Sequence, residues 1–188
     1  MNSAQRKFID RLALVRPRTI QQLLNARFEN SPHQYNLRLI GEGAFRKVFD
    51  VRHGSTSLDI VIKFPYRDGT AWSICCAREH ACDEIRILRL ISESDKYLAL
   101  RRYMLPLLYA DTKTGITVMP KHAYAPWTMR FFGFVTAFDN LLIDLLPEMR
   151  YEFDGVNANF GLTVDDDGTE HYVLLDAGLL GAWRKPRK

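Results

Sequence analysis

The spacing of apolar residues changes along the chain, from a helical period near the N-terminus to short β-rich runs after Tyr35. Residues 3–27 carry apolar side chains three or four positions apart and contain Pro17. This predicts one or two helices interrupted near that proline. Two β-rich runs then flank a glycine-containing turn and a third run follows, at residues 37–39, 48–51 and 58–64. These runs predict three strands.

Long helical periods alternate with short strands in the rest of the chain. Residues 71–92 place Ala81, Ile85 and Leu88 on one face, which predicts a long helix, and residues 127–146 predict a second one. Further strands are expected at residues 105–109, 116–119, 160–164 and 172–175. The order of elements predicts an α+β protein with a sheet-rich first half and a helical second half.

Composition narrows the class of protein. The 188 residues are 47% hydrophobic and 12% aromatic, which is typical of a folded globular chain. The longest apolar run, residues 131–146, contains Asp139 and Asp144, so it favours a buried helix over a membrane span. No signal peptide is visible, and we expect a cytoplasmic protein without a membrane partner. The net charge of +4 is too mild to indicate nucleic acid.

Two features near the first strands suit phosphate chemistry. Gly41 and Gly43 lie in the turn IGEGAFRKV, where the missing Cβ lets backbone amides approach phosphate oxygens. An ordinary hairpin turn has the same signature. Lys63 ends the run VIK, and a lysine among β-branched residues favours an anionic partner. That anion is either a phosphate or a carboxylate, and an exposed strand-end lysine is the alternative.

A carboxylate on the helix at residues 71–92 is a candidate partner for Lys63. Glu84 shares a face with Ala81 and Leu88, so we expect it to point inward. Glu79 projects well round from that face and is the competing candidate. The choice between the two glutamates stays open, and a solvated helix glutamate is the alternative for both.

Oxygen-bearing side chains recur in two later segments. Asp154 and Asn159 stand five apart in the loop DGVNAN, and Asp176 follows the apolar run VLL in the segment DAG. An amide oxygen and a carboxylate suit Mg²⁺, which prefers hard oxygen ligands. A separate carboxylate can accept the proton of an acceptor group. Each segment taken alone is also compatible with a capped turn.

In their order, these motifs resemble the signature set of the protein kinase-like superfamily: glycine-rich loop, strand lysine, helix glutamate, Asp-x-x-x-x-Asn loop and Asp-x-Gly. The resemblance spans about residues 37–180. It implies a two-lobe fold with an antiparallel sheet in the N-lobe and a much reduced helical C-lobe. The implied parts are a helical extension at residues 1–33, an N-lobe at 34–121 and a minimal C-lobe at 122–188.

The resemblance also implies roles for the site residues. Gly41 and Gly43 would cover the phosphates of ATP, and Lys63 would hold them while pairing with Glu84. Asp154 would accept the proton of the acceptor hydroxyl. Asn159 and Asp176 would hold Mg²⁺. The segment from Val118 to Lys121, with Met119 at its centre, would face the adenine with its backbone groups.

Several departures from the family pattern bear on function. Arg46 replaces the third glycine of the loop, Glu152 and Phe153 precede Asp154, and Ala177 is the central residue of the last triplet. Ten residues follow Gly178, so we expect no peptide-docking platform. The first expectation is an ATP- and Mg²⁺-dependent phosphotransferase acting on a hydroxyl of a protein, of itself or of a small molecule. A pseudokinase-like nucleotide-binding regulator is the alternative, and an unrelated interaction protein is the third.

Overall fold

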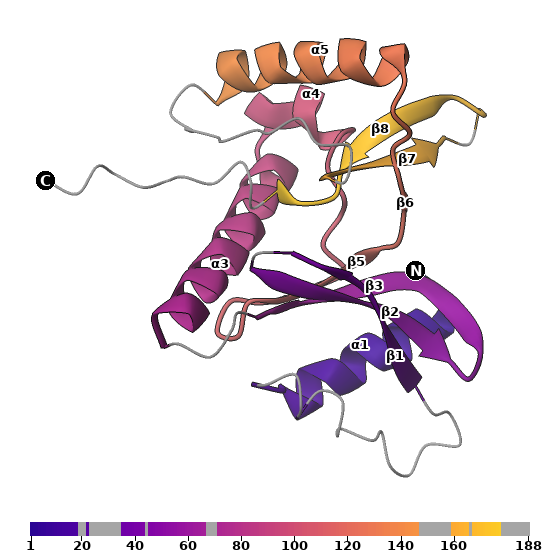
Figure 1. Ribbon diagram of the computed structural model, residues 1–188, viewed down its shortest axis with the longest axis vertical. Helices are drawn as coiled ribbons and strands as arrows, with labels where there is room; N and C mark the ends of the chain where they lie inside the picture. The colour runs from indigo at the N-terminus through magenta and orange to yellow at the C-terminus, as the bar shows by residue number, and fades with distance from the viewer. Residues whose placement is uncertain are drawn as a thin grey trace, which may run out of the picture. The chain divides into compact units, whose positions relative to one another are not determined.

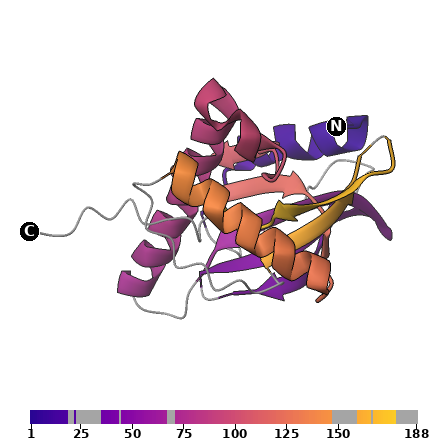
Figure 2. The ribbon, with the colours of Figure 1, turned by 90° about the horizontal axis from the view of Figure 1, so that it is seen from above.

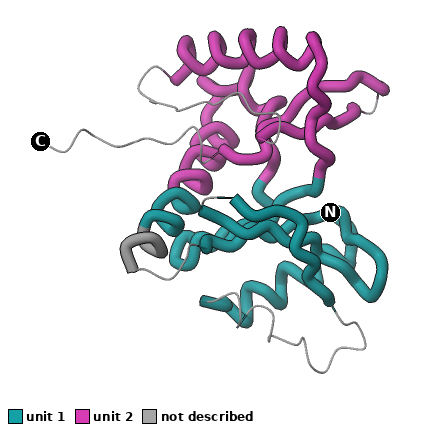
Figure 3. Tube along the Cα trace, viewed as in Figure 1, with its two compact units in different colours: residues 1–82, 107–121 teal, residues 83–106, 122–188 magenta. Residues whose placement is uncertain are grey.

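The computed structural model describes residues 1–18, 22, 35–43, 45–66, 71–146, 159–165 and 167–177. This part of the chain is mixed α+β, which confirms the predicted class, and it contains a five-stranded antiparallel sheet. The chain divides into two compact units (Figure 3). Unit 1 comprises Met1–Cys82 and Leu107–Lys121, and unit 2 comprises Asp83–Pro106 and His122–Lys188.

Unit 1 is a helix packed on the five-stranded sheet (Figure 1). The helix α1 covers Ser3–Val15 and begins with a capping box, in which the Asn2 side chain accepts from the Gln5 N–H and the Gln5 side chain accepts from the Asn2 N–H. The strand order is β1-β2-β3-β5-β4. The strands cover Tyr35–Glu42 (β1), Arg46–His53 (β2), Thr56–Pro65 (β3), Tyr109–Asp111 (β4) and Ile116–Pro120 (β5).

One face of this sheet forms the core of unit 1 with α1. Phe8 and Leu12 of the helix are 0% and 1% exposed, so the helix buries the central part of its apolar stripe. On the sheet side they join alternate strand residues, as the period of two requires. These sheet residues are Phe49, Val51, Leu58, Ile60, Ile62, Phe64, Ile116 and Val118. The β-rich run that predicted β3 therefore contributes four residues to this face.

The long helix α3 covers Ala71–Glu93, close to the predicted 71–92. The division between the units falls inside it, after Cys82. Gly115, in the turn between β4 and β5, approaches it so closely that a Cβ there would lie 2.8 Å from the Cβ of Ala81. Its φ of +75° also favours glycine.

Unit 2 packs α5, Met129–Leu145, over a three-stranded sheet of order β6-β7-β8 (Figures 1 and 2). The strands cover Ala123–Tyr124, Phe160–Val164 and Glu170–Leu174. Thr128 caps the helix through a hydrogen bond from the Phe131 N–H at 3.2 Å. The Phe131 ring makes edge-on contacts with the rings of Phe160 and Tyr172, which fixes the helix on the strands.

Gly161 in β7 is required by close packing within unit 2. A Cβ at this position would lie 2.9 Å from His122 Cβ, 2.9 Å from Leu175 Cδ2 and 3.1 Å from the Ala123 carbonyl oxygen. The last of these is a backbone atom, which cannot swing away as a side chain can. Glycine therefore lets β6 pair closely with β7.

Two predictions of secondary structure need correction. The strand expected at residues 105–109 is Tyr109–Asp111, because Pro106 has no N–H to donate to a ladder. The sequence also gave no signal for the short helical turns at Asp95–Tyr97 and Leu98–Arg101. Among the described helices, none has the length and apolar character needed to cross a bilayer.

Candidate functional site

The second face of the unit 1 sheet carries polar side chains in two cross-strand rows. Val48 of β2, Lys63 of β3 and Thr117 of β5 are in register and form one row. The second row, listed in the same strand order, is Asp50, Val61 and Met119. All six residues alternate with residues of the α1 core, so they lie on the opposite face.

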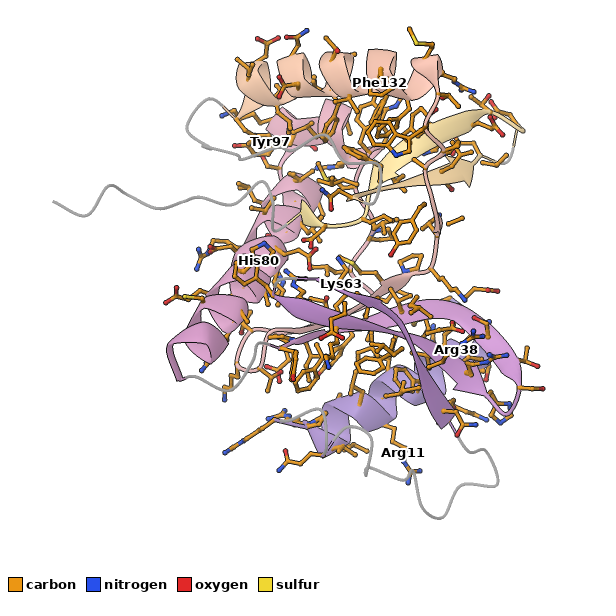
Figure 4. All side chains as sticks on the ribbon, in the orientation of Figure 1. Arg11, Arg38, Lys63, His80, Tyr97 and Phe132 are labelled. Carbon is orange, nitrogen blue, oxygen red and sulfur yellow. The ribbon has the colours of Figure 1, made fainter. Side chains whose placement is uncertain are left out.

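Lys63 lies at the centre of this face and is 5% exposed (Figure 4). The alternative of an exposed strand-end lysine is therefore wrong. A buried ammonium costs several kcal/mol of desolvation unless charged or polar groups compensate, on the order of the penalties seen for buried ions. The position of Lys63 therefore requires a charged or polar partner for its ammonium group.

Thr117 is a polar residue that the sequence analysis did not single out. It is 0% exposed and directly opposite Lys63 on β5, and its hydroxyl has no hydrogen-bond partner among the described residues. A buried hydroxyl without a partner destabilises the folded state by roughly 1–3 kcal/mol. Its place beside Lys63 makes it a candidate binding residue. Only the β3–β5 register reveals it, and the sequence carries no signal for that register.

A buried ion pair lies one row away on the same face. The Lys121 ammonium is 3.0 Å from Asp50 Oδ1, and the Ser57 hydroxyl donates to the same oxygen at 2.7 Å. Asp50 is 3% exposed, whereas the Lys121 side chain is partly exposed. This pair ties β2 to the residue that follows β5. The pair also gives the Lys121 ammonium a partner. Lys121 is the last residue of the segment around Met119 that was expected to face the adenine.

The glycine-containing turn joins β1 to β2, as predicted. Gly41 pairs with Val48 beyond an irregularity in the β1–β2 ladder, and the Gly43 N–H donates to the Arg46 carbonyl at 2.9 Å. A Cβ on Gly43 would approach only the Arg46 carbonyl oxygen, at 4.0 Å, so the neighbouring chain leaves space beside it. Met119 is 1% exposed, pairs with Val61 and lies in β5, as the strand predicted at residues 116–119 requires.

The inward position predicted for Glu84 is correct. Glu84 is 0% exposed, and Glu79 lies on the exposed side of α3. Within unit 2, Glu84 Oε1 accepts a hydrogen bond from the Ala177 N–H at 3.2 Å. The helix thereby holds the residue next to Asp176. The pairing of either glutamate with Lys63 stays a prediction.

Asn159 and Asp176 lie at the same end of the β7–β8 hairpin. The Leu175 N–H donates to the Asn159 carbonyl at 2.8 Å, extending the ladder by one pair beyond Phe160 and Leu174. Asp176 follows directly, and its neighbour Ala177 is 1% exposed. The pairing therefore brings together two predicted metal ligands that are seventeen positions apart in sequence.

The amide and carboxylate oxygens of these two residues are suited to Mg²⁺, which takes few protein ligands and keeps waters and phosphate oxygens. No group of three or more His, Cys, Asp or Glu side chains that suits a metal occurs in the described residues. Within these described ranges, Asn159 and Asp176 are thus two oxygen donors and not part of an all-protein metal cage. Asp154 lies outside the described residues.

His122 is a titratable group beside this hairpin in unit 2. Burial lowers the pKa of His122, and the positive charge of His171 lowers it further, while a hydrogen bond with the Leu162 backbone acts in the opposite direction. The shift favours the neutral form of the imidazole.

No protein-family model matches the sequence, and no curated protein matches it either. The resemblance to the protein kinase-like superfamily consequently depends on the residues described above and stays a prediction.

Proposed function

We propose that the chain is a kinase-like phosphotransferase that binds Mg·ATP and transfers the γ-phosphate to a hydroxyl group. The observation that carries the proposal is Lys63, a buried ammonium at 5% exposure in the strand that follows the glycine-containing hairpin. Buried ammonium groups, and backbone amides freed of a neighbouring Cβ, are the groups that proteins use to bind phosphates. The glycines lie at the end of β1 and in the β1–β2 turn, and Lys63 lies in β3, the strand that pairs with β2.

The proposal assigns the phosphates to unit 1 and the metal to unit 2. Lys63 would donate to the α- and β-phosphate oxygens, and the backbone at Gly41 and Gly43 would cover the phosphates. Asn159 and Asp176 would hold Mg²⁺, which when bound offsets the negative charge of the phosphates. Glu84 would keep the Asp176 segment in place through its hydrogen bond with Ala177.

In the transfer itself, the acceptor oxygen forms a bond to the γ-phosphorus as the bond to the β–γ bridging oxygen breaks. ADP leaves with the electron pair of the broken bond. The acceptor's proton passes to Asp154, by the resemblance of its loop to the family motif. Most of the rate enhancement would come from positioning and fixed charges, because this chemistry needs little covalent help.

A nucleotide-binding regulator with little turnover is the second candidate function. Arg46 favours it, because a buried arginine at 4% exposure stands where the family pattern has a flexible glycine. A turn fixed by a side chain is less free to close and reopen over a nucleotide, and slow reopening limits turnover. Under this candidate, Mg·ATP binding persists and phosphate transfer is weak.

Nucleotide binding is tested by measuring the thermal stability of the wild-type protein and of Lys63→Met with and without Mg·ATP. Wild type at 100 times its dissociation constant gains about 2.7 kcal/mol of stability, whereas Lys63→Met loses most of that gain because the phosphates lose their buried cation. Arg38→Met is the matched control, since Arg38 is an exposed cation on β1 of the same sheet. Absence of wild-type stabilisation at millimolar Mg·ATP contradicts both candidate functions.

Phosphate transfer from γ-labelled ATP, to the chain itself and to added hydroxyl acceptors, separates the two candidates. Asp176→Ala reduces turnover by at least about 10²-fold under the first candidate, since a fixed charge group is lost. Glu170→Ala, an exposed carboxylate of the same hairpin, is the control. Full activity of Asp176→Ala contradicts the metal assignment. Tight nucleotide binding without transfer in wild type favours the regulator.

A further inference from the structure

Arg46 makes contacts that a glycine at its position could not make. It is the first residue of β2, and its guanidinium Nη2 lies 3.2 Å from His80 Nδ1 and 3.3 Å from the His80 carbonyl oxygen. All of these atoms belong to unit 1, and His80 lies on α3 (Figure 4). The arginine thus binds one residue of the helix through both its side chain and its backbone.

The residue before it adds a second contact to the same histidine. The Phe45 ring stacks on the His80 ring with centroids 4.8 Å apart and planes 23° apart. The Phe45 carbonyl accepts from the Tyr66 N–H at 2.9 Å, which holds the backbone beside the end of β3. Two successive residues at the end of the glycine-containing turn are therefore fixed on α3.

The placement of Arg46 is costly for stability. A guanidinium at 4% exposure loses most of its hydration. Arg46 also lies on the same face as Lys63, because it pairs with Pro65 two positions further along β3. The backbone positions of such diagonal neighbours are about 7–8 Å apart, and like charges at this spacing disfavour each other. A glycine here would avoid these costs but would make neither contact with His80.

One helical turn after His80, α3 contacts a second segment of the chain. His80 and Glu84 are four positions apart on α3 and therefore lie on one side of the helix. Glu84 accepts from the Ala177 N–H, next to Asp176. A single helical turn of α3 thus carries the contact to the glycine-containing turn and the contact to the predicted metal-binding segment.

We propose that Arg46 is a positioning residue that fixes the glycine-containing turn on α3 through His80, so that nucleotide binding at the turn and the position of α3 are coupled. This inference rests on the proposed nucleotide binding. The contact orders the turn before the ligand arrives, which removes part of the entropy cost of binding. By the same linkage, a nucleotide bound at the turn stabilises the Arg46–His80 contact and the part of α3 that carries His80.

Hydrogen exchange of the α3 amides, with and without Mg·ADP, tests the coupling. The variants are Arg46→Gly, which restores the family residue, and Arg46→Lys, which keeps the charge but loses the planar fork. Arg38→Gly is the matched control on an exposed strand position of the same sheet. In wild type we expect Mg·ADP to slow exchange around residues 77–84 by about tenfold. In both Arg46 variants this nucleotide-dependent slowing is lost, and Arg38→Gly retains it.

The variant His80→Phe provides a second test of the coupling. Phenylalanine keeps the ring stack on Phe45 but removes Nδ1, so it weakens the Arg46 contact without emptying the site. We expect Arg46→Lys and His80→Phe each to weaken Mg·ADP binding by about three- to tenfold, and the double variant to be no weaker than the worse single one. Additive effects of the two substitutions overturn the proposal.

Two results separate this inference from its alternatives. If Arg46→Gly weakens ATP but leaves ADP affinity and α3 exchange unchanged, the arginine binds the γ-phosphate directly, and the positioning role is wrong. Exchange measured without nucleotide is independent of the proposed function. Faster α3 exchange in the nucleotide-free Arg46 variants then supports the contact even if no nucleotide binds, whereas unchanged exchange contradicts it.

Discussion

The two faces of the unit 1 sheet are built from the same strands but hold opposite kinds of side chain. Toward α1, every strand contributes apolar residues, and Phe8 and Leu12 complete a core free of charged groups. On the other face, Lys63, Asp50 and Thr117 are as thoroughly buried as that core. The first face supplies apolar packing alone, and the second combines apolar residues with buried polar groups.

The contrast between the two faces indicates where to look for functional residues in a chain that matches no family model. Burying a hydroxyl or an ion costs free energy unless partners compensate fully, whereas burying a methylene contributes about 0.8 kcal/mol. A face that retains buried polar groups in adjacent rows has been shaped by something other than packing. The predictions below test this contrast by substituting residues on each face in turn.

The largest effect is expected on the apolar face. Phe8→Ala removes a ring that is 0% exposed and should lower the free energy of unfolding by about 3–5 kcal/mol. Leu14→Ala is the control, because Leu14 lies on the same helix at 84% exposure and should change stability by less than about 0.5 kcal/mol. Urea unfolding followed by circular dichroism measures both. Equal effects of the two substitutions would show that α1 does not form the core.

An intermediate effect is expected for the buried ion pair. Asp50→Asn keeps an acceptor for the Ser57 hydroxyl but removes the charge that faces Lys121. The loss should be about 1–2 kcal/mol, toward the lower end because Lys121 is partly exposed to water. In a double-mutant cycle with Lys121→Met, the two losses should overlap. Losses that add fully would mean that the pair contributes no coupling energy.

The smallest effect on stability is expected for substitution of Thr117. Unlike the two substitutions above, it should not lower the stability. Thr117→Val keeps the shape of the side chain and removes a buried hydroxyl without a described partner. Stability should stay the same or rise by up to about 1 kcal/mol. Ser57→Ala, which removes a hydroxyl that does donate a hydrogen bond, should lower stability instead. A loss above about 1 kcal/mol in Thr117→Val would mean that the hydroxyl is satisfied in solution.

The sequence predicted what depends on local spacing. The strand predicted from the β-rich run at residues 58–64 and the inward position of Glu84 both follow from residues a few positions apart along the chain, and both predictions are correct. Register between strands is different, because it depends on turn geometry and on packing with distant segments. The row of Val48, Lys63 and Thr117 therefore was not predictable, although Lys63 itself was.

Arg46 illustrates a second limit. In the sequence it is only a departure from a glycine pattern. Its neighbour His80 lies thirty-four positions away, and no local signal links the two. The error at residues 105–109 has another cause: an apolar run was given more weight than Pro106, which cannot donate to a ladder.

Gly161 has a consequence for tracing the ancestry of this protein. Its missing side chain is what lets Ala123, Leu175 and His122 approach β7, so any substitution there would push β6 away. Descendants of a common ancestor can exchange most surface residues without changing the fold, but they cannot exchange this one cheaply. Distant relatives with low overall sequence identity can therefore be recognised by a glycine at this place. It is the second residue of the strand that follows an Asp-x-x-x-x-Asn loop.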